Sequence, residues 1–318
     1  MKIDKEMNRK QAYILPIIMT TVLFLFSSCK DDGLEFDNSG STSNADVFRL
    51  EEAVAGAENM ISDVIHLVQL GIDDESVFSS SEWPIIQKES SGYPLKLSLD
   101  FGRDTNENFD YRYRSGKIIA NISSHWKDSL SIMMIELDDY YVATKTPYYV
   151  DGVKKYYVAE LGGEMEIRVE NKGLTTVDNE RFKTQHIIID SGKAYNSRGS
   201  IGFRTSRETY YTHGYDSPEH GDDKTRNVIH SDGYAFDDKH SYTWSSRNPS
   251  FQDEGLPYFG YNRSCPWAIS GDIRLDYENN TNQQKRKSLI NFGPANQTSC
   301  ENNASYSVGG IIIAITLP

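Results

Sequence analysis

The spacing of hydrophobic residues changes near residue 75. Before that point, apolar residues recur at three- and four-residue steps, at Leu50, Val54, Ala57, Ile61, Val64 or Ile65, and Val68. This period predicts an amphipathic helix within residues 46–75, with one apolar face available for packing on a sheet. Gly71 stands where a left-handed residue often ends a helix, so we expect the regular turns to stop at Leu70.

After residue 75, apolar and polar residues alternate. The alternating runs lie at 95–101, 133–137, 165–169, 201–203, 273–275 and 311–317. Short alternating runs between Gly, Asn and Asp turns are typical of antiparallel strands with one buried face. The predicted fold is mainly β, with antiparallel β-sandwich-like units, two rather than one, preceded by the helix.

Two segments of the chain have weakly similar sequences. "LDFG" at 99–102 precedes "GKIIANI", and "INFG" at 290–293 precedes "GGIIIAITL". Two related units and two hairpins that converge on similar turn chemistry both explain it. The longest polar stretch between strand-like runs begins at residue 213, so we expect one β domain over 76–212 and a second β unit over 213–318.

The first 28 residues have the features of a secretory signal peptide. A basic start is followed by an apolar run of 14 residues, Tyr13 to Phe26, which is shorter than the roughly 20 that a spanning helix needs. Two serines then precede Cys29, an arrangement that resembles the bacterial lipobox, although Phe26 stands where Leu, Val or Ile is usual. We therefore expect cleavage before Cys29 and lipid attachment to it; the alternative is an ordinary signal peptide with a chance cysteine.

The residues after Cys29 are acidic and polar. Lys30, Asp31 and Asp32 resemble the export signal of Bacteroidetes-type surface lipoproteins; a solvated acidic linker is the plainer interpretation. Residues 29–45 are expected to be a flexible tether with a reach on the order of 20 Å. The expected location is the outer membrane, lipid-anchored, at the cell surface rather than on the periplasmic face.

The charge of the chain limits its partners. The formal net charge is -13, and cleavage before Cys29 would change it to -15 by removing four basic and two acidic residues. An acidic surface of this size repels phosphate backbones, so nucleic acid is not an expected partner.

Cys265 and Cys300 are the two cysteines that remain after Cys29. Export would place them in an oxidising compartment where disulfides persist, so we expect them to form a disulfide. Two unpaired thiols are the alternative. A metal pair is not expected, because neither cysteine has a second ligand at the usual short spacing.

No motif predicts catalysis, a metal or a cofactor. The histidines and aspartates between 213 and 240 lack a spacing that brings two ligands onto one face, and "DTNENFD" at 104–110 lacks the glycine and the distal glutamate of a helical calcium loop. "DFG" at 100–102 has no kinase context, and no nucleophile elbow is present. We expect a protein that is not an enzyme, although a pair of acids for sugar hydrolysis stays open.

Adjacent tyrosines occur in "DDYYV", "TPYYVDGVKKYYV" and "ETYYTHGYD". Because neighbouring side chains on a strand point to opposite faces, one tyrosine of each pair should be exposed. An exposed tyrosine ring suits glycan or protein binding. Ordinary cross-strand packing explains the same pattern.

Several segments together resemble a family of Bacteroidetes-type outer-membrane and surface lipoproteins. They are "LSLDFG", "RSGKIIANIS", "ELDDYYV", "GYDSP" and "CPWAISGDIRL", with a late cysteine before "NN". The resemblance covers residues 50 to 318. "CENN" departs from the usual Cys-Asp-Asn, and 145–163 resembles an insertion. The resemblance supports the expected location and the two-cysteine pattern, and it implies no catalytic residues or ligand.

The expected function is that of a lipid-anchored cell-envelope protein that binds a glycan or a protein partner without catalysis. A fimbrillin-like structural or adhesion subunit is an alternative, although the early helix argues against it. A secreted glycan hydrolase is a second alternative.

Overall fold

A computed structural model describes the chain from residue 44 onwards, with gaps. The described residues are 44–73, 75–80, 82–150, 153–177, 180–196, 199–211, 225–236, 240–245, 259–262, 268–280, 282–283, 285–293, 303–308 and 311–317. All of them belong to one compact unit, Asn38–Pro318, which contains its own hydrophobic core.

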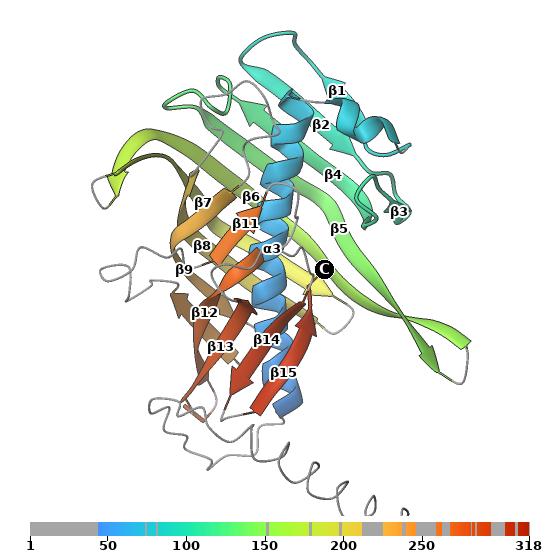
Figure 1. Ribbon diagram of the computed structural model, residues 1–318, viewed down its shortest axis with the longest axis vertical. Helices are drawn as coiled ribbons and strands as arrows, with labels where there is room; N and C mark the ends of the chain where they lie inside the picture. The colour runs from blue at the N-terminus through green and yellow to red at the C-terminus, as the bar shows by residue number, and fades with distance from the viewer. Residues whose placement is uncertain are drawn as a thin grey trace, which may run out of the picture. The chain divides into compact units, whose positions relative to one another are not determined.

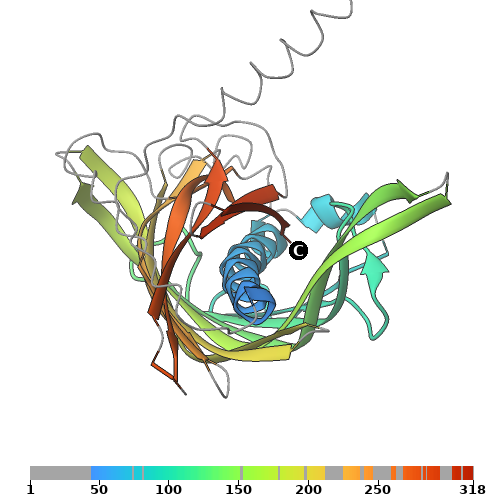
Figure 2. The ribbon, with the colours of Figure 1, turned by 90° about the horizontal axis from the view of Figure 1, so that it is seen from below.

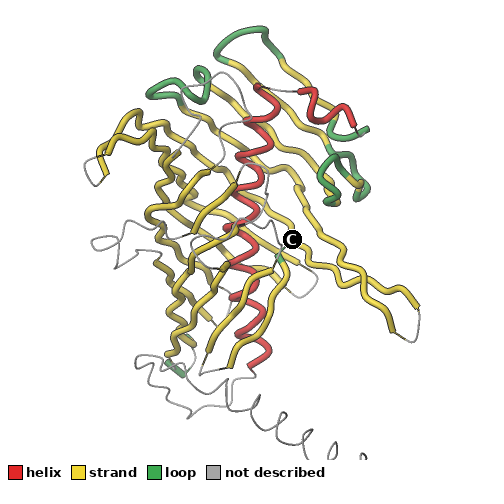
Figure 3. The backbone as a smooth tube through the Cα atoms, viewed as in Figure 1, coloured by secondary structure: helices red, strands yellow, loops and turns green. Residues whose placement is uncertain are grey.

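The described residues form one long helix, a short 3-10 helix and a 15-stranded antiparallel sheet (Figures 1 and 3). The elements are α3 (Asn44–Asp73), η1 (Glu75–Ser80), β1 (Ile85–Lys88), β2 (Leu95–Asp100), β3 (Asn106–Glu107), β4 (Tyr113–Ile122), β5 (Ile132–Val150), β6 (Val153–Val177), β7 (Glu180–Asn196), β8 (Gly199–Tyr211), β9 (Thr225–Phe236), β10 (His240–Ser245), β11 (Phe259–Asn262), β12 (Ala268–Asn279), β13 (Lys285–Gly293), β14 (Asn303–Val308) and β15 (Ile311–Thr316). The prediction of a mainly β, antiparallel fold preceded by a helix is confirmed.

The strands follow one another almost in chain order. The order is β1-β2-β4-β5-β6-β7-β8-β9-β10-β12-β13-β14-β15, with β3 beside β4 and β11 beside β9 and β12. The ladder passes the predicted boundary at residue 213, because β8 and β9 on its two sides are paired. Residues 212–224 lie outside the described part of the chain, and the division into two units stays a prediction.

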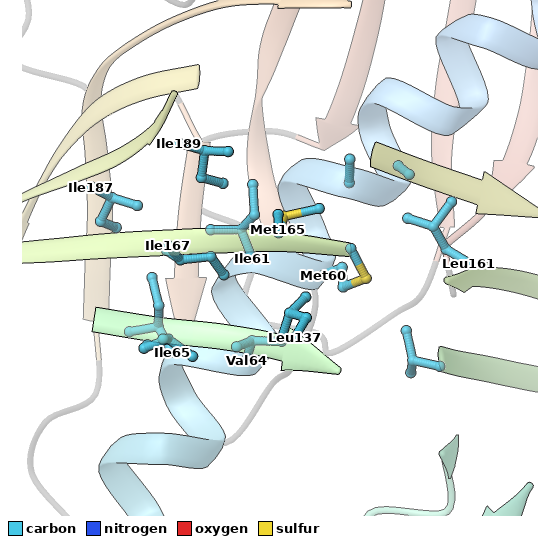
Figure 4. Close-up of a cluster of buried hydrophobic side chains, with 14 of the residues drawn as sticks. Met60, Ile61, Val64, Ile65, Leu137, Leu161, Met165, Ile167, Ile187 and Ile189 are labelled. Atoms are coloured by element: carbon cyan, nitrogen blue, oxygen red, sulfur yellow. The ribbon is translucent and has the colours of Figure 1, made fainter. Parts of the chain in front are cut away.

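The sheet curves around α3 (Figure 2). One face, here called the inner face, is turned towards the helix. In Figure 4, helix side chains meet inward-pointing side chains of β5, β6 and β7: Met60, Ile61, Val64 and Ile65 lie near Leu137, Leu161, Met165, Ile167, Ile187 and Ile189. Each fully buried Leu, Ile or Met contributes about 1.5–3 kcal/mol, so this contact stabilises the fold by many kcal/mol. Within the described residues, no helix has the length and hydropathy that a membrane span requires.

The predicted end of the helix is wrong by one turn. α3 continues through Gly71 to Asp73. A side-chain carbon at Gly71 would lie 3.0 Å from Leu97 Cδ2 and 3.2 Å from Leu99 Cδ2. The glycine therefore allows the helix to approach β2 closely, rather than ending the helix in a left-handed conformation.

The similarity between the segments that begin at residues 99 and 290 has a local explanation. Asp100 Oδ1 accepts a hydrogen bond from the Gly102 amide at 2.9 Å, and Asn291 Oδ1 accepts one from the Gly293 amide at 2.9 Å. However, β2 pairs directly with β4, whereas β14 lies between β13 and β15. The two segments share a turn chemistry without sharing a strand arrangement, which favours convergence.

Candidate functional site

The polar side of α3 is buried as completely as its apolar side. Asp63 is 1% exposed and lies between two guanidinium groups, with Arg112 Nη1 at 2.7 Å and Arg114 Nη2 at 3.0 Å from Oδ1. The Tyr140 hydroxyl donates to Asp63 Oδ2 at 3.2 Å. These groups join the helix to β4 and β5. The pairing could not be predicted from local sequence patterns, because the partners are about 50 and 77 residues apart.

A second buried ion pair joins α3 to β8. Arg207 Nη1 lies 2.7 Å from Glu58 Oε2, and the Thr205 hydroxyl donates to Glu58 Oε1 at 2.9 Å. Arg207 Nη2 also donates to the Ser62 hydroxyl oxygen at 2.8 Å. The two buried carboxylates of the helix, Glu58 and Asp63, thus both form ion pairs that fix α3 to the sheet.

Asp110 belongs to the same group of charges. Burial alone would raise the pKa of its carboxyl group, but the adjacent Arg114 guanidinium, through its charge and hydrogen bonds, holds that pKa well below the usual range. The two Arg114–Asp110 hydrogen bonds measure 2.6 and 2.7 Å. An acid in this state is a poor general acid at neutral pH, because it stays ionised. In the 104–110 loop, the Asp110 carboxylate is therefore used in an ion pair with Arg114.

The C-terminal end of α3 is fixed by an aspartate. Asp73 Oδ1 lies 2.7 Å from His125 Nε2, and Asp73 Oδ2 accepts the Trp126 indole N–H at 2.6 Å. His125 Nδ1 accepts the Lys127 amide at 3.2 Å, which assigns the ring proton to Nε2, facing Asp73. With both ring nitrogens engaged, His125 is a structural residue rather than a general base.

The opposite, outer face of the sheet carries aromatic rings that are partly exposed. Tyr195 on β7 faces Gly162 on β6 across the ladder, and Gly162 in turn faces Tyr141 on β5. The Tyr195 ring lies over Gly162, because a side-chain carbon there would meet Tyr195 Cε2 at 2.2 Å. The ring therefore occupies the space that any other residue at 162 would need.

The same arrangement recurs two strands away. Phe236 on β9 faces Gly202 on β8, and a side-chain carbon at Gly202 would lie 2.3 Å from Phe236 Cζ. Tyr234 stacks beside Phe236 with ring centroids 5.5 Å apart and an interplanar angle of 29°. The Arg204 guanidinium lies 4.8 Å from the centroid of the Tyr234 ring. Phe236 is 47% exposed.

We call these four rings, Tyr141, Tyr195, Tyr234 and Phe236, the outer aromatic surface. Aromatic rings that cover glycines on a sheet are held by the backbone beneath them, which limits their freedom before any ligand arrives. Polar groups stand beside the rings: the Tyr141 hydroxyl donates to Glu160, and the Tyr195 hydroxyl donates to Asp139 Oδ1 at 3.5 Å. Burial, and then the nearby charges of Asp139 and Glu164, raise the pKa of Tyr195, so its hydroxyl stays protonated at neutral pH.

Only one of the adjacent tyrosine pairs has both side chains described, and its two members lie on opposite faces, although the outer one is half-buried rather than exposed. In "DDYYV", Tyr140 is buried on the inner face and Tyr141 is half-buried on the outer face. In "ETYYTHGYD", Tyr211 is buried, and its donation to Gln185 Oε1 at 3.1 Å makes it part of the interior. The side chains of Tyr148, Tyr149, Tyr156, Tyr157 and Tyr210 lie outside the described residues.

Tyr195, Tyr234 and Phe236 were not among the residues predicted from the sequence. Each ring lies next to a small residue that points inward, Ala194 in "KAYN" or Ala235 in "GYAF". This alternation could have indicated that the rings point outward. The glycines under the rings could not be assigned to them without the strand register.

The other predicted site residues lie outside the described part of the chain. These are Cys29, Lys30, Asp31 and Asp32 near the N-terminus, and Cys265 and Cys300, so lipid attachment, the export signal and the disulfide stay predictions. The side chains of His213, His220, His230 and His240 are likewise undescribed. Among the residues that are described, no group of three or more His, Cys, Asp or Glu side chains could hold a metal ion.

Comparison with known proteins gave no match to a family model, to a curated protein or to a solved structure. The resemblance to surface lipoproteins therefore stays a prediction from the sequence motifs.

Proposed function

We propose that this chain is a lipid-anchored cell-envelope protein that binds a glycan through the outer aromatic surface and does not act as an enzyme. The observation that carries the proposal is the pair of covered glycines, Gly162 and Gly202. Each holds an aromatic ring against the sheet, and the rings stay partly exposed, Phe236 to 47%. Sugar rings present apolar C–H faces that pack on such rings, and their hydroxyls hydrogen-bond to neighbouring polar side chains.

The buried acidic side chains are paired with basic ones, which supports a binding function rather than a catalytic one. In the described residues the deeply buried carboxylates, Glu58 and Asp63, face arginines across ion pairs. Asp110 is bound by Arg114, and the nitrogens of His125 are both engaged. A hydrolase would need one carboxyl group kept protonated beside an ionised one, and none of these groups meets that need.

The helix supports the choice of a binding protein over a fimbrillin-like subunit. Such subunits start with a strand that is removed by cleavage, whereas the first described element here is α3, buried at the centre of the sheet. Removal of α3 would expose the core rather than a groove for one strand.

The test uses the compact unit, residues 38–318, which has its own core. A glycan array and titration calorimetry would be run on the parent and on Tyr195→Ala and Phe236→Ala. We expect selective retention of a glycan by the parent and about fivefold weaker binding for each variant, since one aromatic contact is worth about 1 kcal/mol. Tyr111→Asn is the control, because Tyr111 is 81% exposed but lies in a turn away from this surface, where its φ of 62° suits asparagine.

Two outcomes would contradict the proposal. Absence of binding to every glycan would exclude glycan recognition, and equal binding by the parent and both alanine variants would place the contact elsewhere. The location is tested separately in cells: Cys29→Ala should release the protein from the membrane fraction, and protease treatment of intact cells should remove the domain. Full protection would mean an inward-facing anchor.

A further inference from the structure

The outer aromatic surface has opposite charges at its two ends. At the Tyr195 end stand carboxylates: Asp139 accepts the Tyr195 hydroxyl, and Glu164 faces Lys193 across the ladder. At the Phe236 end, Arg204 faces Tyr234 across the ladder, and Gly202 lies under the Phe236 ring. Lys193 lies between the two ends, because it faces Glu164 on one side and Gly202 on the other, and its ammonium lies over the Tyr195 ring. The surface therefore passes from two carboxylates on β5–β6 to Arg204 on β8.

Two cations of this surface, Arg204 and Lys193, are held by rings rather than by acids. The Arg204 guanidinium lies over Tyr234 at 4.8 Å, and the Lys193 ammonium lies over Tyr195 at 5.5 Å. No carboxylate among the described side chains lies within 4.0 Å of either group, whereas Lys88, Lys96 and Lys117 each form an ion pair with a nearby acid. Stacking orients a cation without neutralising it, so both keep their capacity to bind an anion.

The spacing of the rings sets the size of the ligand. The Tyr195 ring rests on β6 and the Phe236 ring on β8, and strands two apart are separated by about 10 Å. A ligand that touches both rings must be an oligosaccharide rather than a single sugar. Its two contact points also meet different chemistry, because the Tyr195 ring lies beside two carboxylates and one ammonium, whereas Phe236 and Tyr234 lie beside the Arg204 guanidinium.

Resting on the proposed glycan-binding function, we propose that the ligand is an acidic oligosaccharide bound in one direction across the strands. A sugar carboxylate lies at the Phe236 end, where the Arg204 guanidinium can bind it with two parallel hydrogen bonds. A neutral sugar lies at the Tyr195 end, where its hydroxyls donate to Asp139 and Glu164. An acidic sugar at that end would meet two carboxylates and only one ammonium, that of Lys193, which favours this direction of the chain.

The test pairs ligands that differ only in charge. The unit 38–318 would be titrated with uronic-acid oligosaccharides and their methyl esters, and with sulfated oligosaccharides and their unsulfated counterparts. We expect at least about tenfold tighter binding of the acidic member of a pair, since a charge-assisted bidentate contact is worth well over 1 kcal/mol. Added salt should weaken the acidic member only.

Variants separate this inference from the function on which it rests. Arg204→Gln and Lys193→Gln should remove the preference for the acidic member while neutral binding persists; Arg274→Gln, an exposed arginine on β12, is the control. Equal affinity for both members of every pair, or an unchanged preference in Arg204→Gln, overturns the acidic ligand and leaves glycan binding standing. Failure of the parent to bind any member of the panel, acidic or neutral, removes the proposed function itself.

Discussion

Replacement of Asp63 by asparagine should cost the fold about 3 kcal/mol. Asp63 is 1% exposed, and its carboxylate faces Arg112 and Arg114 at 2.7 and 3.0 Å, with the Tyr140 hydroxyl at 3.2 Å. Removal of one partner of a buried ion pair typically destabilises by about 3–5 kcal/mol, because the other charge is left uncompensated. The lower value is expected here because Arg114 keeps Asp110. Asparagine preserves the volume, so no cavity adds to the loss.

The assay is equilibrium unfolding of residues 38–318 in denaturant at pH 7, followed by circular dichroism, with thermal unfolding beside it. A loss of about 3 kcal/mol lowers Tm by about 6–12 °C for a domain of this size. Glu136→Gln is the matched control, because Glu136 is exposed and directly faces Glu166 across the ladder, so loss of its charge should be neutral or slightly stabilising. If Asp63→Asn were as stable as Glu136→Gln, the ion pairs would not be holding the helix, and the reasoning would be refuted.

Three further predictions concern other parts of the molecule. Because the pKa of native Asp110 is depressed, its contribution to stability should be fully present above about pH 4, where the unfolded aspartate is ionised, and should be lost as pH falls towards the native pKa; Asp110→Asn should flatten an acid-unfolding curve in that window. Gly162→Ala should weaken glycan binding in calorimetry as much as Tyr195→Ala does, because the new methyl group would lie 2.2 Å from the Tyr195 ring; unchanged affinity would mean that the seated ring is not required. If Cys265 and Cys300 are paired, reduction should lower the free energy of unfolding by about 3–4 kcal/mol, and a free-thiol count of two in the unreduced protein would rule the pair out.

Local patterns were sufficient to predict the fold class and part of the inner face of the sheet, but they missed strands such as β7 and β9, and Ile313 in the predicted run 311–317 is 37% exposed. Leu97, Ile135, Ile167 and Ile273 all lie buried on strands, as their alternation with polar residues indicates. The end of the helix was misjudged at Gly71, because glycine serves equally well as a stop and as a point of close contact, and only the position of β2 distinguishes the two.

The candidate site could not be predicted to the same extent. Whether an aromatic ring covers a glycine depends on the residue that faces it on the next strand. The register that brings Tyr195 opposite Gly162 depends in turn on bulges in the β6–β7 ladder. The buried charges are similar, since Glu58 meets Arg207 across 149 residues of sequence. Non-local pairing of this kind leaves no periodic trace in the chain.

The two ion pairs of α3 also determine how the helix is registered within the sheet. An apolar helix in an apolar channel could rotate, or slide by one turn of 5.4 Å, and still bury much of the same surface. Glu58 and Asp63 are five residues apart, which places them about 140° apart around the helix axis and about 7.5 Å apart along it. Their partners lie on β8 and β4, on different parts of the sheet. Rotation or sliding would break both ion pairs at once. These charges therefore select one alignment of the helix among several that would bury a similar apolar area.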